Sequence, residues 1–284
     1  MRAPRAYSVL TVYLSIVCGI TLILYIAASG SGTNGVNDSS NVGAALFYVI
    51  VGMQTLLVSF LTPAFTAGAL NGERERGVYD LLRMTAISPA QIVISKLAAS
   101  VGYTFLLVFA TLPLLSLALL LGGVEVLQLV AALAVVLMSA TLFSSLGLYV
   151  SARMTTMLGS TIVTYAVTTA IVIGMAVFTL IAFPLLNDLI YGSSSVVKTS
   201  PFLGVIVQLF SFFTMSISPI SAMVSSEANL QLGGNAWLVS VAPLPGSPSV
   251  IDVPAPFVIL IVLYMVVSAL LLWRTTKRLA GNTY

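Results

Sequence analysis

The sequence predicts an all-α integral membrane protein with six transmembrane helices, and three observations lead to this fold class. Of the 284 residues, 59% are hydrophobic and only 7% are charged, whereas globular chains carry roughly 25% charged residues. Six apolar runs each reach the ~20 residues that a helix needs to cross a bilayer. The basic residues gather in connections that would share one side of the membrane. We therefore expect residues 1–284 to form a single transmembrane domain.

The composition excludes several classes of function. The chain has no histidine, and its one cysteine, Cys18, lies inside an apolar run. We therefore expect no disulfide within the chain and no Cys/His metal site, and we predict no metal-ligating residues. The sequence also lacks the G-x-x-x-x-G-K-[ST] loop that holds nucleotide phosphates, so no catalytic residue is predicted. The net charge of +3 reflects membrane topology, and no nucleic-acid partner is expected.

The first three predicted spans are residues 7–28, 42–70 and 92–121. A Gly/Ser/Asn-rich loop at residues 30–41 joins the first two. A cleaved signal peptide is an alternative for the first run, because small residues follow it at positions 27–29. Its apolar core is longer than the ~7–15 residues of a signal peptide, which favours a retained helix.

The last three predicted spans are residues 126–152, 157–186 and 257–273. A tight Gly122-Gly123 turn precedes the fourth span, and residues 153–156 separate the fourth from the fifth. Residues 187–256 form a long polar-apolar-polar segment. Its middle, 201–224, is apolar enough to cross but contains a Ser-Pro break at Pro219.

The distribution of charge decides whether residues 201–224 cross the membrane. If they do not, ten of the eleven basic residues share one side with three of the eight acidic residues, and only Lys198 lies opposite. Basic residues concentrate on the cytoplasmic side of multi-pass proteins. The sequence thus predicts a cell inner (plasma) membrane protein with both termini cytoplasmic. It also predicts that 187–256 is extracytoplasmic and that 201–224 forms re-entrant or interfacial helices before the sixth span.

The connector at residues 71–91, between the second and third spans, holds six of the nineteen formal charges. Within it, Val78, Leu81, Leu82 and Thr85 follow the spacing of one helical face, which predicts a short amphipathic helix. A new helix is expected to start with Ser88 as N-cap, Pro89 at the first position and Gln91 in a capping box.

The stretch from Glu73 to Lys96 resembles a motif of ABC-2 type transporter permeases, E-x-E-R-G-T-x-E-x-L-L-x-T-P-x-S-x-x-E-I-x-x-G-K. Ala86 replaces the usual Pro and Gln91 the usual acid. Residues 144–153 also resemble the end of that family's fourth helix, while the family's elbow helix has no counterpart in the six residues before Tyr7. The matching positions are Glu73, Glu75, Arg76, Gly77, Asp80, Leu81, Leu82, Thr85, Ser88 and Lys96.

The resemblance implies a membrane-spanning permease subunit of an ATP-driven ABC exporter. Its partners would be a second permease subunit, identical or homologous, two copies of an ABC ATP-binding subunit, and the lipid bilayer. The chain itself would bind no cofactor and catalyse nothing, because ATP and Mg²⁺ would be held by the partner. The connector would include the coupling helix that docks on the ATPase. The implied docking residues are Glu73, Glu75, Arg76, Gly77, Val78, Asp80, Leu81, Leu82, Arg83 and Thr85.

Two alternatives stay open for the connector. It could be a loop helix that lies at the lipid headgroups, or the docking element of a non-transporting scaffold or assembly subunit that recruits a partner ATPase. An ion-coupled carrier is disfavoured, because no Asp, Glu, Lys or Arg lies near the middle of a predicted span.

Neutral polar and aromatic residues at membrane depth are candidates for the translocation path, because the family's second and fifth helices border it. The alternative is structural, since Thr often bonds its own helix backbone and small residues join membrane helices. Ala140, Ser144, Gly147 and Ser151 are predicted to be such close-packing residues. The path candidates are Phe47, Gln54, Val58, Thr62, Phe65, Thr161, Thr164, Tyr165 and Thr168.

Overall fold

The computed structural model describes residues 3–30, 36–75, 77, 88–122, 124–191, 201–231, 237–241 and 251–281. Among these residues, six helices are long and apolar enough to cross a membrane, the number that the sequence predicts. Residues 201–224 are not among them. The six spans are Tyr7–Ala27, Val42–Glu75, Pro89–Leu121, Val126–Arg153, Met157–Leu186 and Pro256–Ala280.

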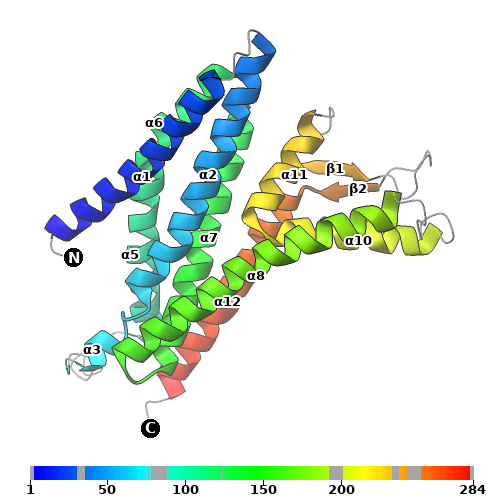
Figure 1. Cartoon of the computed structure of the whole chain (residues 1–284). Helices are drawn as coiled ribbons and strands as arrows, with labels where there is room; N and C mark the ends of the chain where they lie inside the picture. Colours follow the sequence, from blue (N-terminus) through cyan, green and yellow to red (C-terminus); the bar gives the residue numbers. More distant parts are fainter. Residues whose placement is uncertain are drawn as a thin grey trace. The chain divides into compact units, whose positions relative to one another are not determined.

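The chain divides into two compact units, Met1–Thr168 with Tyr264–Tyr284, and Thr169–Leu263. Two long helices, α8 and α12, contribute to both. The first unit also contains a set of helices shown in Figure 1. Their bounds are α1 (Ala3–Gly30), α2 (Val36–Thr66), α3 (Asn71–Glu75), α5 (Pro89–Ala110), α6 (Leu112–Leu121), α7 (Val126–Arg153), α8 (Met157–Tyr191) and α12 (Pro256–Gly281).

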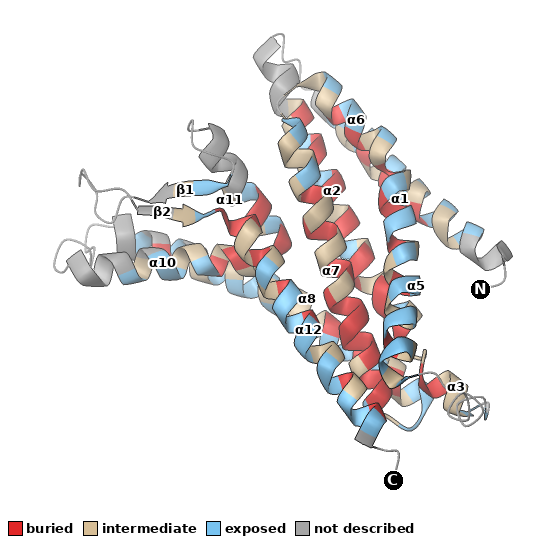
Figure 2. Ribbon diagram, turned by 180° about the vertical axis from the view of Figure 1, so that it is seen from behind, coloured by how far each residue is buried: buried red, intermediate tan, exposed pale blue. Residues whose placement is uncertain are grey.

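Helix α2 packs against α1, α5, α6 and α7, and α7 also packs against α5. The second half of α7 is buried almost without interruption, as the red part of its ribbon in Figure 2 shows. Gly147 of α7 lies so close to α2 that a Cβ there would come 2.1 Å from Thr66 Oγ1. Ala140, Ser144 and Ser151 of the same helix are fully buried. The predicted close-packing face is therefore confirmed, and it meets α2 and α5.

Hydroxyl groups join the buried faces of this unit. Ser100 of α5 and Ser144 of α7 are 3.0 Å apart, and Thr62 of α2 lies 3.4 Å from Thr104 of α5. Interhelical hydrogen bonds of this kind stabilise helix packing in a medium that offers few other partners.

Large apolar side chains cover the outward surfaces of the spans. Leu120 is 85% exposed and Leu158 is 78% exposed, and many Val, Ile and Phe side chains are also exposed, though to a smaller extent. Soluble monomers rarely expose so much contiguous apolar surface, whereas lipid tails solvate it.

The start of α5 matches its prediction. Ser88 Oγ accepts from Gln91 N at 3.3 Å, and Gln91 Oε1 accepts from Ser88 N at 3.0 Å, which completes the capping box. The third span is not one continuous helix, however, because it breaks at Thr111. Pro113 lies in the first turn of α6, where its missing N–H is tolerated and where it prevents α5 from continuing.

The second unit contains the rest of α8, the start of α12, α10 (Pro201–Ile217), α11 (Pro219–Gln231), β1 (Leu238–Val241) and β2 (Ile251–Pro254). The break between α10 and α11 falls at Ser218, as the Ser-Pro pair predicts. Ser221 Oγ donates to Ser218 O at 3.0 Å and so supports the new helix start.

The two strands depart from the expected all-α fold. They pair antiparallel, with Leu238 opposite Pro254 and Val241 opposite Ile251. Ala255 N donates to Trp237 O at 2.8 Å and extends this pairing by one bond. Alternating β-branched residues favour such strands. They are too short to carry a hydropathy signal, so an analysis based on 20-residue runs misses them.

Three helix bounds also differ from expectation. α2 begins at Val36, inside the loop expected at 30–41. α8 continues to Tyr191 and α12 to Gly281, beyond the expected apolar limits. Apolar composition marks the membrane-embedded part of a helix, whereas the hydrogen-bonded helix extends into polar sequence on either side.

Candidate functional site

Four elements of the first unit meet around one apolar cluster. Its buried members are Leu70 at the entry to α3, Val93 of α5, Leu148 and Ala152 of α7, and Leu279 of α12. Figure 1 shows α3 and the C-terminal end of α12 at the same end of this unit. The start of the connector (Asn71–Glu75), Arg153 and the basic end of α12 therefore lie at one end of this unit.

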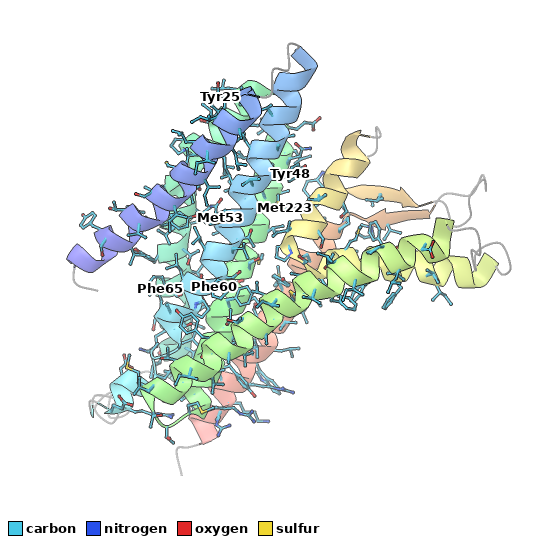
Figure 3. All side chains as sticks on the ribbon, in the orientation of Figure 1. Tyr25, Tyr48, Met53, Phe60, Phe65 and Met223 are labelled. Carbon is cyan, nitrogen blue, oxygen red and sulfur yellow. The ribbon has the colours of Figure 1, made fainter. Side chains whose placement is uncertain are left out.

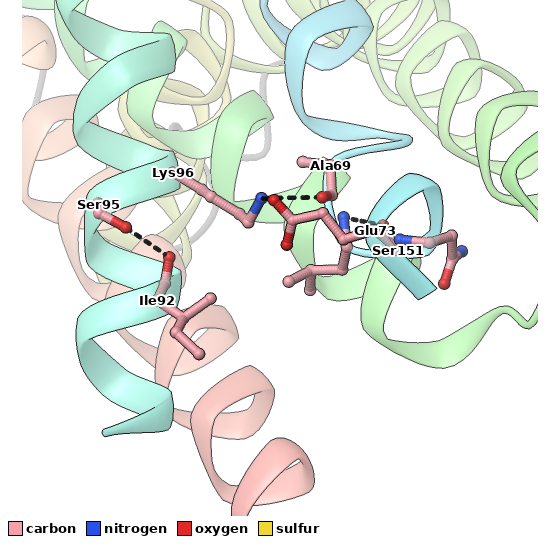
Figure 4. Close-up of polar contacts among 8 residues, drawn as sticks. Ala69, Glu73, Ile92, Ser95, Lys96 and Ser151 are labelled. Carbon is pink, nitrogen blue, oxygen red and sulfur yellow. Dashed lines mark hydrogen bonds and ion pairs between the residues drawn. The ribbon is translucent and has the colours of Figure 1, made fainter. Parts of the chain in front are cut away.

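An ion pair ties the start of the connector to the helix that follows it. Lys96 Nζ of α5 lies 2.5 Å from Glu73 Oε1 of α3 and donates to Ala69 O at 2.9 Å (Figure 4). The two side chains are 19% and 31% exposed, so water screens the pair only in part. Both residues belong to the stretch that resembles the permease motif, and the structure brings them together across the connector.

The first turn of the connector is also held by α7. Ser151 Oγ accepts from Leu70 N at 3.2 Å and from Asn71 N at 3.4 Å. Asn71 Nδ2 donates to Thr156 O at 3.3 Å, in the short turn between α7 and α8. The two bonds to Ser151 Oγ satisfy backbone N–H groups that have no partner within the helix where α3 begins.

Glu75 fastens the connector to the start of α8. Its Oε1 accepts from Met157 N at 2.7 Å. A carboxylate at this position meets the partial positive charge of a helix N-terminus, which stabilises both groups. Glu73 and Glu75 thus bind their own chain, and their expected contact with an ATPase stays a prediction.

The remaining docking residues are only partly described. Gly77 has φ +68°, a left-handed conformation that suits glycine and marks the end of the α3 turn. The predicted amphipathic helix lies outside the described residues. So do seven of the implied docking residues, namely Arg76, Val78, Asp80, Leu81, Leu82, Arg83 and Thr85.

Most path candidates on α2 are buried within the chain. Phe47, Gln54, Val58 and Thr62 are at most 1% exposed. Phe65, labelled on α2 in Figure 3, is half-buried, and its ring meets Tyr103 of α5 edge-on at 4.8 Å.

Two residues of α8 form hydrogen bonds with α2 or with the turn that follows it. Tyr165 Oη donates to Phe60 O at 3.3 Å, and Ser160 Oγ donates to Ala67 O. Thr164 and Thr168 are buried, whereas Thr161 and Tyr165 are half-buried. Among the path candidates on α8, Tyr165 is therefore the one with a hydrogen bond to α2 within the described part of the chain.

Three of the path threonines bond their own helix. Thr62 donates to Val58 O at 2.6 Å, Thr161 to Met157 O at 2.9 Å and Thr164 to Ser160 O at 2.7 Å. These bonds follow the structural alternative, in which a hydroxyl satisfies its own backbone. Thr168 Oγ1 has no hydrogen-bond partner among the described residues.

Two buried polar side chains, Tyr13 of α1 and Gln54 of α2, lie next to each other. The amide oxygen and nitrogen of Gln54, and the Tyr13 hydroxyl, lack hydrogen-bond partners among the described residues. Tyr13 nevertheless lies next to the side chains of Gln54 and Thr111. Gln54 was identified from the sequence, but Tyr13 was not, because an aromatic residue in an apolar run carries no signal of a polar neighbour.

No protein-family model matches this sequence, and no curated protein matches it significantly.

Proposed function

We propose that this chain is the permease subunit of an ATP-driven exporter of the ABC-2 type. The observation that supports the proposal most directly is the charged connector between α2 and α5. An ion pair between Glu73 and Lys96 binds the start of this connector to α5. In this proposal the chain spans the plasma membrane six times, with both termini and the connector in the cytoplasm. It forms the translocation path with a second permease and docks on two ATP-binding subunits.

The contacts of the connector suggest how a partner could act on the membrane helices. The connector leaves α2 and returns as α5, so a force on it is applied to both helices. Glu73 and Lys96 bind the start of the connector to α5, and Ser151 and Glu75 bind that same start to α7 and α8. A partner ATPase that closes on ATP would thus move a fastened group of helices rather than a free loop.

The part of the connector that would touch the ATPase is residues 78–85. Val78, Leu81 and Leu82 provide one apolar face with charged residues around it, the composition of a helix that docks into a groove. ATP would be bound by the partner, since the chain has no phosphate-binding loop.

The test is purification of the full chain from its native membranes in mild detergent. We expect an ATP-binding subunit with a Walker A loop to co-purify, and ATP hydrolysis to appear only when it is present. A partner ATPase whose activity supports no transport after reconstitution would favour the scaffold alternative. A well-folded chain that retains no ATPase would contradict the proposal.

A further inference from the structure

A basic hollow of about 330 Å³ lies between the C-terminal ends of α7 and α12 in the first unit. Tyr149 and Arg153 line it from α7. Arg274, Lys277 and Arg278 line it from α12. The four cationic side chains are exposed, while Tyr149 is half-buried. Four positive charges from two helices therefore converge on one small volume.

On each side of the hollow, one of the lining cations lies beside an aromatic ring. The Arg153 guanidinium lies 5.3 Å from the centre of the Tyr149 ring. Lys277 Nζ lies at the same distance from the ring of Trp273. Such contacts hold a cation in place without neutralising it, so the charges stay available to an anion.

Within the described part of the chain, none of these four cations forms an ion pair with a carboxylate. The helix C-termini offset only part of their charge, because a helix end carries about half an elementary charge. Two helix ends cannot balance four cations that repel one another. Among the described residues, the hollow therefore carries an excess of positive charge, which an anion would offset.

The surface next to the hollow indicates which kind of anion. Val266, Leu270 and Trp273 precede Arg274 and Lys277 on one face of α12, with spacing i, i+4, i+7, i+8 and i+11. The first three are more than half exposed. Trp at the end of a membrane span marks the level of the lipid headgroups. A ligand with a phosphate in the hollow would thus extend an acyl chain along Leu270 and Val266.

We propose that this hollow binds the phosphate group of an anionic phospholipid. Arginine suits the role, since its planar guanidinium donates two parallel hydrogen bonds to phosphate. Basic pockets between membrane helices bind anionic lipid headgroups on the same physical grounds. The site uses α7 and α12 and none of the residues implied in ATPase docking, so it does not depend on the proposed transport function.

Trp273 allows a direct test, because the chain has two tryptophans. In a Trp237→Phe background, Trp273 is the sole tryptophan reporter. The protein is placed in vesicles of equal phosphatidylglycerol and phosphatidylcholine, in which one of the two lipids carries brominated acyl chains. Brominated phosphatidylglycerol should quench Trp273 more strongly, with a preference of at least about five-fold, the factor that a single contribution of ~1 kcal/mol corresponds to.

Matched variants separate the site from general charge attraction. Arg274→Gln with Lys277→Gln should bring the preference close to one. Arg2→Gln with Arg5→Gln removes the same charge elsewhere and should keep it. Arg274→Lys with Lys277→Arg keeps the charge, so it should keep the preference and show that the helix end tolerates substitution.

Four results would overturn the proposal. One is equal quenching by the two lipids in the parent protein. Another is an equal loss of preference in the Arg2/Arg5 variant, which would mean nonspecific attraction. Removal of the preference by inorganic phosphate at constant ionic strength would assign the site to a soluble phosphate. Removal by a bound partner ATPase would assign the hollow to that protein.

Discussion

At Gly147, the backbone of α7 approaches α2 more closely than any side chain permits. A Cβ at this position would lie 2.1 Å from Thr66 Oγ1 and 3.3 Å from Ala67 N. The hydroxyl could rotate, but the backbone nitrogen belongs to the turn that leads into the connector. One missing side chain thus sets the distance between two central helices of the first unit.

Gly147→Ala should lower the free energy of unfolding by about 1–3 kcal/mol, the cost of an extra methyl group in a packed interface. Gly102→Ala is the matched control, because a Cβ at Gly102 meets nothing within 4 Å. It should leave stability unchanged or raise it by up to about 1 kcal/mol. Thermal unfolding of both variants in the same detergent measures the difference, and equal stabilities would show that α7 has room at Gly147.

The Glu73–Lys96 contact binds the start of the connector to α5. The pair is partly buried and the amine also binds Ala69 O, so its geometry is better defined than that of a surface pair. The resemblance to the permease motif identified both residues, but it did not indicate that they contact each other.

A double-mutant cycle of Glu73→Gln and Lys96→Met should give a coupling energy of about 0.5–1 kcal/mol, the range of partly screened ion pairs. Raising the salt concentration should reduce it. The control cycle combines Glu73→Gln with Arg274→Gln, residues that form no ion pair with each other. Additive behaviour in the first cycle would mean that the clamp does not form in the membrane.

The connector between α2 and α5 is charged, its start is packed against neighbouring helices, and the proposed function assigns it the contact with the ATPase. Its start is fixed by Ser151, Glu73 and Glu75. Its end is fixed by the capping box at Ser88, which begins α5. The amphipathic stretch between these two ends is where a partner could bind.

Leu81→Asp or Leu82→Asp should release the ATPase and abolish transport. Truncating a central interface residue typically costs more than ~2 kcal/mol, and burying an unpaired charge costs at least as much. Tyr79→Asp, at a position outside the apolar stripe, is the control and should retain the partner. Pull-down yield and membrane expression are the measurements. A Leu81→Asp protein that keeps its ATPase and transports normally would remove docking from this segment.

In the chain as a whole, the charged residues lie near the ends of the apolar helices and not near their middles. The start of the connector, Arg153 and the end of α12 share one end of the first unit through the cluster around Leu148. This grouping agrees with the side on which the positive-inside rule places them.

Reporter fusions at Met1 and Tyr284 should both give cytoplasmic signals, because ten of the eleven basic residues then lie inside. A fusion at Lys198 should give an external signal and serves as the control. An external Tyr284 together with a cytoplasmic Met1 would require an odd number of crossings, so residues 201–224 would have to span.

The purified chain alone should neither hydrolyse ATP nor bind it stoichiometrically, because it lacks a phosphate-binding loop. Hydrolysis should appear when the partner subunit is added. Equilibrium dialysis and phosphate release measure the two quantities. Nucleotide binding at one equivalent per chain would contradict the assignment of ATP to a partner.

Four features could be predicted from local sequence: the apolar composition typical of a membrane protein, six long apolar helices, the start of α5 at Ser88 and the break before Pro219. Each of these features depends on local physics. Twenty apolar residues suit hydrocarbon, a Ser side chain caps a helix within three residues, and proline removes one backbone donor. Such signals are complete within a short window of sequence and need no knowledge of distant neighbours.

The contacts between residues that are far apart in the sequence became known only from the tertiary structure. It placed Gly147 against Thr66, paired Glu73 with Lys96, and assembled the basic hollow from Arg153 and the end of α12. It also paired the strands at Leu238 and Ile251. Helix periodicity identifies the face on which a residue lies, but not the helix which that face will meet. That choice depends on packing between segments far apart in the chain, and no local pattern records it.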